Sequence, residues 1–233
     1  MKRVIVAIPV LAAVSLLLLV LLPQRGAPPG AWGELTPGSP AASARTIIPN
    51  HDFSVSSLSG WSQFRRHDAL PIDIPDGEVD PAGGRSGGAY HIGPGVAKKA
   101  GIAAAWTSGV NHADWFLDGF ARFKFSSGRG WVGIELVFEG KMGQPVSTYL
   151  AWKGTPGVAP PRREAGLVEE MSQAVEPGWW RVPTRTTFDL RARGLAMPET
   201  SYSITLRLIV EFEDAEGEAW FDDLDFRDMR TGR

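Results

Sequence analysis

Apolar and polar residues alternate with a period of two along much of the chain after residue 46. From Tyr202 to Phe212 every second residue is apolar, and the residues between them are mostly polar or charged. The segment 131–139 alternates in the same way. This period is typical of β-strands with one buried face, and no apolar repeat of about 3.6 residues extends far enough here to indicate a long helix.

Further strand-like runs are separated by short segments rich in glycine, proline and charged residues. The runs are 89–92, 103–108, 115–125, 146–153, 179–190 and 218–227, and the turn signals are 81–84, 128–130, 139–141 and 216–217. Roughly eight to ten strands without strand–helix–strand alternation predict an all-β fold, an antiparallel β-sandwich of the jelly-roll type. We expect 163–174 to form a short helix or a loop insertion, and 65–85 to form a long surface loop.

The N-terminal segment has a different pattern. Lys2 and Arg3 precede an uncharged apolar run from Val4 to Leu22. As a helix this run spans roughly 28 Å, close to the ~30 Å core of a bilayer. No small-residue cleavage site follows closely, which favours an uncleaved signal anchor over a cleaved signal peptide. By the positive-inside rule, the residues beyond the helix face the periplasm or the cell exterior.

The expected organisation therefore has three parts. A transmembrane helix occupies 1–23, and a linker rich in proline, glycine and alanine occupies 24–45. The jelly-roll domain occupies 46–233, and the linker holds it away from the membrane surface.

Composition narrows the function classes. With 43% hydrophobic residues and nine tryptophans, the chain is too apolar to be mainly disordered. The absence of cysteine excludes disulfides, thiolate zinc sites and thiol nucleophiles. A formal net charge of -2 gives no electrostatic case for a nucleic-acid partner. The four histidines do not have metal-ligand spacing, and no nucleotide-binding or hydrolase motif is present.

Three motifs mark the start, the late part and the end of the domain. The start reads I-P-N-H-D-F from Ile48 and continues to G-W at Trp61, the late motif reads G-W-W-R-V from Gly178, and the end reads A-W-F-D-D-L-D-F from Ala219. In this order they resemble the opening, late and closing strands of the galactose-binding-like jelly-roll superfamily, in particular its carbohydrate-binding modules. The resemblance spans about residues 47–228 and implies a jelly-roll fold and glycan binding.

The resemblance also implies a structural Ca²⁺ ion between the opening and closing strands. Asp52 and Asp222 are the side chains that could hold it, since Ca²⁺ prefers oxygen ligands. The sequence departs from the family pattern at His51 and at Ser54, which stands where a glutamate is often a calcium ligand. The period-two alternation along the closing strand puts Asp222 on the same face as Trp220, which is expected to face the core. A buried carboxylate needs a metal ion, backbone N–H groups or an arginine as partner.

Candidate ligand contacts lie on the polar faces of the strands. Glycans pack on aromatic rings, while polar side chains bind their hydroxyl groups. Trp61, Trp180 and Trp220 match core positions and are expected to be structural. The predicted ligand-binding residues are Trp131, Glu135, Arg207, Glu211 and Arg122. The alternative interpretation is that this set forms a solvated, salt-bridged face of the sheet.

These features predict a membrane-anchored, non-catalytic carbohydrate-binding module on the periplasmic or extracellular side, with a glycan or polysaccharide as its partner. The alternative is a protein-interaction module of an envelope or polysaccharide-assembly complex. Catalysis is not expected. Glu135 and Glu211 could in principle supply the carboxylate pair that glycoside hydrolysis needs, but nothing in their spacing singles them out. Apart from structural Ca²⁺, no cofactor is expected.

Overall fold

The computed structural model describes residues 46–66, 76–109, 114–196 and 203–229. The predicted transmembrane helix over 1–23 and the predicted linker over 24–45 lie outside these ranges. Among the residues described, no helix is long and apolar enough to cross a lipid bilayer.

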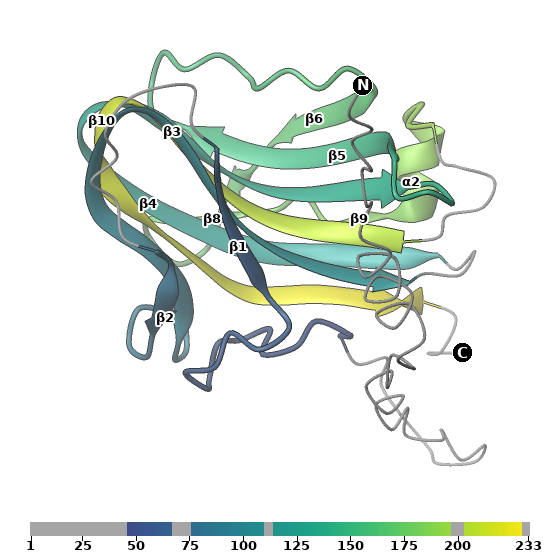
Figure 1. Cartoon of the computed structure of the whole chain (residues 1–233), viewed down its shortest axis with the longest axis horizontal. Helices are drawn as coiled ribbons and strands as arrows, with labels where there is room; N and C mark the ends of the chain where they lie inside the picture. Colours follow the sequence, from purple (N-terminus) through teal and green to yellow (C-terminus); the bar gives the residue numbers. More distant parts are fainter. Residues whose placement is uncertain (1–45, 67–75, 110–113, 197–202, 230–233) are drawn as a thin grey trace, which may run out of the picture. The chain divides into compact units, whose positions relative to one another are not determined.

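Three long strands run through both layers of the fold (Figure 1): β3 (Ala89–Gly109), β4 (Trp115–Glu139) and β10 (Ser203–Asp228). β10 pairs with β3 on one side and with β4 on the other. The turns predicted at 128–130 and 216–217 are bends through which the strands continue. At Gly128 the backbone φ is +70°, and a Cβ atom there would lie 1.7 Å from the carbonyl oxygen of Asp214. The bend therefore requires glycine.

Shorter elements complete the described fold. They are β1 (Ser62–Arg66), β2 (Glu78–Asp80), β5 (Pro145–Gly154), β6 (Gly166–Glu170), β7 (Ser172–Gln173), β8 (Trp179–Arg181), β9 (Arg185–Thr186) and the helix α2 (Thr187–Ala192). The main strand order is β1-β3-β10-β4-β5-β6. The pairs are antiparallel except for β5 and β6, which are parallel. The predicted all-β sandwich is confirmed, with one parallel edge.

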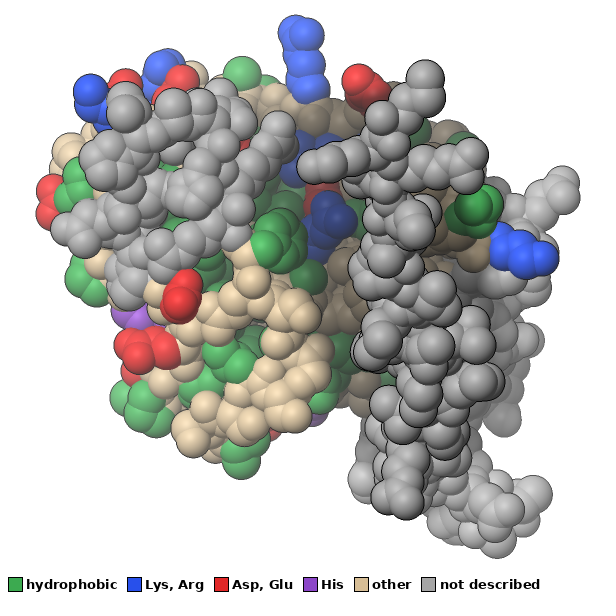
Figure 2. Space-filling view, in the orientation of Figure 1, with side chains coloured by type: hydrophobic (Ala, Val, Ile, Leu, Met, Phe, Trp, Pro, Cys, Tyr) green, Lys and Arg blue, Asp and Glu red, His purple; other side chains and the backbone are tan. Residues whose placement is uncertain are grey.

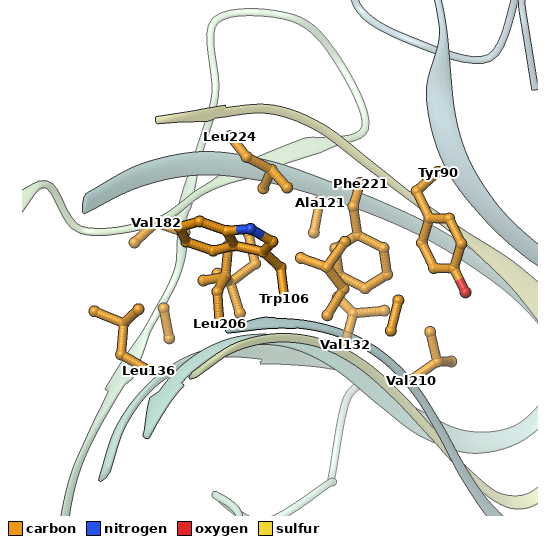
Figure 3. Close-up of a cluster of buried hydrophobic side chains, with 14 of the residues drawn as sticks. Tyr90, Trp106, Ala121, Val132, Leu136, Val182, Leu206, Val210, Phe221 and Leu224 are labelled. Atoms are coloured by element: carbon orange, nitrogen blue, oxygen red, sulfur yellow. The ribbon is translucent and has the colours of Figure 1, made fainter. Parts of the chain in front are cut away.

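The bends in the long strands fold one continuous sheet into two facing layers. The front sheet contains β1, β5, β6 and the halves of β3, β10 and β4 that pair between them. The back sheet contains β2, β7, β8, β9 and the other halves of the same three strands. Buried side chains of the two sheets point toward one another and form the core (Figure 3). They include Val132, Leu136, Leu206 and Val210 of the front sheet and Tyr90, Ala121, Phe221 and Leu224 of the back sheet.

Two segments differ from the sequence prediction. The run 179–190 is not one strand, because α2 begins after Thr186. The Thr186 side-chain oxygen accepts a hydrogen bond from the backbone N–H of Asp189, and the Asp189 carboxylate accepts one from the N–H of Thr186. This reciprocal cap starts a helix despite a strand-like composition. The segment 163–174 contains β6 rather than a helix or insertion, because it pairs with β5.

A bulge in β10 changes which residues of the strand face the core. The register shifts around Asp223, whose φ is +49°. Before the bulge Phe221 belongs to the main core, and after it Leu224 does. Trp220 and Asp222 are buried, with 5% and 1% exposed. They lie on the outer side of the back sheet, so the prediction that they face the main core is wrong.

Candidate functional site

The front sheet arches with the core side chains on its convex side, which leaves the opposite face concave (Figure 3). Strand register brings four predicted ligand residues together on this concave face. Trp131 of β4 lies directly opposite Glu211 of β10, and Glu135 lies directly opposite Arg207. The two strands are neighbours, so the four residues share one face of the sheet, and ligand binding by them stays a prediction.

A groove of about 490 Å³ crosses the concave face. Its lining includes Phe64, Glu135, Arg162, Arg163, Arg207 and Glu211. A second lobe of about 370 Å³ shares Arg162, Arg163 and Glu211 with the first and extends to Trp131. In Figure 2, basic and acidic side chains lie beside hydrophobic ones near the centre of the viewed face, a combination that the lining of the groove also has.

Glu135 is the buried centre of the groove, and only 3% of its side chain is exposed. One carboxylate oxygen accepts a hydrogen bond from Nε of Arg163 at 2.5 Å, and the other accepts one from Nη1 of Arg207 at 3.3 Å. These charge-assisted hydrogen bonds offset the cost of burying the carboxylate. They also fix two guanidinium groups, which keep other N–H groups for a ligand.

The segment 155–165, called the strap below, links β5 to β6 and covers part of the concave face. Val158 of the strap packs against the buried cluster that contains Trp131. The Arg163 guanidinium lies 5.8 Å from the centre of a Trp131 ring. Trp131 is therefore only 6% exposed. The predicted stacking residue offers little ring surface to a ligand while the strap is in place.

Two other groups are better placed to contact a ligand. Phe64 of β1 is 43% exposed, and the Arg207 guanidinium lies 5.8 Å from its ring centre. Glu211 also lines the groove and makes no hydrogen bond or ion pair with another described residue, so none of these residues occupies its carboxylate oxygens.

The sequence prediction missed Phe64 and Arg163. Phe64 stands alone as the apolar residue of the five-residue strand β1, which is too short to show alternation. Arg163 opens the segment predicted as a helix or insertion. Only the pairing of β6 with β5 places the strap across the groove.

Arg122 does not belong to this site. It lies in the half of β4 that crosses into the back sheet, opposite Trp220 and Trp179. Its guanidinium is 4.2 Å from the Trp220 ring centre and 4.8 Å from that of Trp179, and its Nη2 donates to the carbonyl of Gly83 at 2.8 Å. Burial lowers the pKa of Arg122. The prediction that it joins the concave set is wrong, because β4 spans both sheets.

The two predicted calcium ligands accept hydrogen bonds from backbone N–H groups. One carboxylate oxygen of Asp222 accepts from the backbone N–H of Arg85 at 2.6 Å, and the other from that of Asp223 at 2.7 Å. Asp52 accepts from the backbone N–H of Ser54. No group of three His, Cys, Asp or Glu side chains that could hold a metal occurs among the described residues. Backbone donors thus satisfy Asp222, and Ca²⁺ binding stays a prediction.

Burial also raises the pKa of Asp222 to about 6, and the nearby charge of Asp223 acts in the same direction. The N–H groups of Arg85 and Asp223 act in the opposite direction but do not cancel the effect of burial. The carboxylate is therefore sensitive to pH in the mildly acidic range.

No protein-family model and no curated protein sequence matches this chain. Its structure is similar to a CBM61 module solved in complex with beta-1,4-galactotriose, with 10% identity and a TM-score of 0.48 over 79% of this chain and 99% of that one. The CBM22-1 xylan-binding domain from Paenibacillus barcinonensis Xyn10C gives 12% identity and a TM-score of 0.45 over 81% and 97%. The family 11 xylanase from Neocallimastix patriciarum gives 13% identity and a TM-score of 0.42, over 75% of this chain and 95% of the xylanase. Similarity at this level does not assign a function to this chain.

Proposed function

We propose that this chain is a non-catalytic carbohydrate-binding module that holds an oligosaccharide in the concave groove. The observation that carries the proposal is the combination of groups in the groove. An exposed aromatic ring, Phe64, lies beside the Arg207 guanidinium, which Glu135 holds together with that of Arg163, and the carboxylate of Glu211 also lines the groove. Sugars need this combination, because a pyranose has an apolar C–H face and hydroxyl groups that both donate and accept.

The charges that line the groove favour a neutral ligand. Three arginines are matched by three glutamates: Arg162, Arg163 and Arg207 against Glu135, Glu164 and Glu211. Because the charges of these described lining residues balance, they provide no excess of either sign that would concentrate an ionic polymer. Hydroxyl groups exchange hydrogen bonds with both kinds of side chain.

The size of the groove favours several sugar rings over one. It extends from Phe64 on β1 across β3, β10 and β4 to Thr148 on β5. Five neighbouring strands at about 4.8 Å spacing give a width of about 19 Å. The volume of the larger lobe, about 490 Å³, lies within the range of small-molecule sites.

The placement of the acidic residues supports binding rather than glycoside hydrolysis. Glu135 and Glu211 lie on neighbouring strands, but Glu211 is in register with Trp131 rather than with Glu135. The resulting offset is about 13 Å along the strands. Glycosidases need their two carboxyl groups roughly 5–9.5 Å apart. Both oxygens of Glu135 are also held by arginines.

The N-terminal sequence supports a membrane-attached form of this module. The apolar run from Val4 to Leu22 has the length of a bilayer span and follows Lys2 and Arg3. We infer that it anchors the chain in the membrane, with the sandwich on the periplasmic or extracellular side.

A panel of immobilised neutral and acidic glycans, probed with the full-length chain, tests the proposed function. We expect saturable binding to at least one neutral polysaccharide and weaker binding of that polysaccharide by Glu211→Gln. Glu78→Gln is the matched control, because Glu78 is an exposed glutamate of β2 in the back sheet. Absence of binding across the panel, or equal binding by the two variants, would contradict the proposal.

A further inference from the structure

A second depression lies beside the strap, and it has a volume of about 690 Å³. Val158 of the strap lines both this depression, called the edge pocket below, and the second lobe of the groove. The strap therefore separates the two. The side chains on which the inference rests are Phe123, Lys153, Glu170, Trp180, Pro156 and Pro160.

The wall of the edge pocket is aromatic. Trp180 and Phe123 are partly buried: they pack against the main core and also line the pocket. The sequence predicts a core role for Trp180, and the structure adds a second surface. Pro156 and Pro160 of the strap line the pocket as well. Together these residues give an apolar surface of the kind on which the C–H face of a sugar packs.

One ion pair supplies the charged groups of the pocket. Lys153 Nζ lies 2.5 Å from Glu170 Oε1 and 4.2 Å from the ring centre of Trp180. The Lys153 side chain is 20% exposed and that of Glu170 is 59% exposed. The ammonium has three N–H donors, and Glu170 has a second carboxylate oxygen. The pocket thus places donors and an acceptor beside an aromatic ring, without net charge.

We propose that the edge pocket is a second glycan-binding subsite, separate from the concave groove. A neutral pyranose unit packs its apolar face against Trp180 and Phe123, while its hydroxyl groups bond to Lys153 and Glu170. The ligand class rests on the proposed function of the chain, but the site rests on its own lining residues. Two subsites on one domain would raise the affinity for a polysaccharide that reaches both, by effective concentration.

The experiment is isothermal titration of the full-length chain with β-1,4-galactotriose and with xylohexaose. We expect two ligands bound per chain. Glu170→Gln is the main variant, because its exposed side chain can change without disturbing the core. It is expected to weaken one binding event at least fivefold and leave the other unchanged. Phe64→Ala should show the reverse selectivity, and Glu78→Gln should change neither event.

The outcomes separate this inference from the proposed function. A single binding event that is weakened in Phe64→Ala and unchanged in Glu170→Gln overturns the edge pocket and keeps the groove. Binding that responds only to Glu170→Gln keeps the edge pocket and overturns the groove. Binding of neither sugar, or binding of a proline-rich peptide alone at the edge pocket, overturns the second subsite.

Discussion

The two outer faces of the sandwich contain the same kinds of residue but differ in what covers them. On the concave face, Arg163 and Arg207 flank Glu135 beside Phe64, and an open groove remains. On the back sheet, a stack of rings and a guanidinium is closed. We call this the covered face, and it consists of Trp179, Arg122, Trp220 and His91. A tryptophan next to an arginine occurs on both faces, so this pair does not by itself identify a ligand site.

The loop between β2 and β3 closes the covered face. The carbonyl of Gly83 accepts from Arg122, and a Cβ atom at Gly83 would lie 2.8 Å from the Trp220 ring. Asp80 accepts from Nε1 of Trp220 at 3.1 Å. Arg85 bonds to Asp223 and reaches across to Glu176. Most polar groups of this face bond inside the protein, although Nε of Arg85 and Nε of Arg122 are buried without a partner. We therefore expect the face to contribute stability rather than binding.

The largest expected effect comes from breaking the covered face. Trp220→Ala removes a buried indole, its stacking on His91 at 4.7 Å and its contact with Arg122. We expect a loss of about 3–5 kcal/mol of unfolding free energy. Chemical denaturation followed by circular dichroism measures it. A loss below about 1 kcal/mol would show that the face is not structural.

The two glutamates of the groove sharpen the comparison within the concave face. Glu135→Gln leaves Arg163 and Arg207 without their buried counter-charge. We expect the free energy of unfolding to fall by about 2–4 kcal/mol. Glu211→Gln removes a carboxylate with no described partner, and we expect a change within about 0.5 kcal/mol. Denaturant titrations of the two variants side by side measure both. Equal losses would mean that the ion pairs around Glu135 do not hold the strap.

Asp222, on the outer side of the back sheet, makes the free energy of unfolding depend on pH. Because burial raises its pKa to about 6 in the fold, from an ordinary value of 3.8, protonation favours the folded state. Its contribution is fully present below pH 3.8 and is lost as the pH rises through about 6. The loss is at most about 3 kcal/mol. The difference in unfolding free energy between the wild type and Asp222→Asn, measured with EDTA from about pH 4 to about pH 8, should follow this course.

Bound calcium would reverse this dependence of the unfolding free energy on pH. A bound Ca²⁺ ion favours the ionised carboxylate, so stability near neutral pH would rise on adding the metal. A melting temperature unchanged by Ca²⁺ and by EDTA would mean that the N–H groups of Arg85 and Asp223 are the only partners of Asp222.

The sequence was sufficient for the sandwich and for part of the site. Alternation placed Trp131, Glu135, Arg207 and Glu211 on one face, because period two survives wherever a strand is regular. It failed at Trp220, since one extra residue in a bulge exchanges the two faces. Alternation reports the side of a sheet, not what covers that side.

The other errors of the sequence prediction concern residues whose place depends on long-range contacts. Arg122 follows strand parity correctly, but β4 passes into the other sheet at a bend that looks like a turn in the sequence. Arg163 and Phe64 reach the groove from segments with no alternation of useful length. Their place depends on β5–β6 and β1–β3 pairing, which are not encoded in the neighbouring residues.

Affinity for an oligosaccharide in Phe64→Ala, compared with Phe188→Ala, tests the concave groove most directly. Both rings are exposed, by 43% and 69%, and Phe188 lies on α2 without lining the groove. Titration of the two full-length variants with the best-bound neutral oligosaccharide should show a roughly 2- to 10-fold weaker affinity for Phe64→Ala. Phe188→Ala should bind as the wild type does. Equal affinity in the two variants would contradict the concave groove as the binding site.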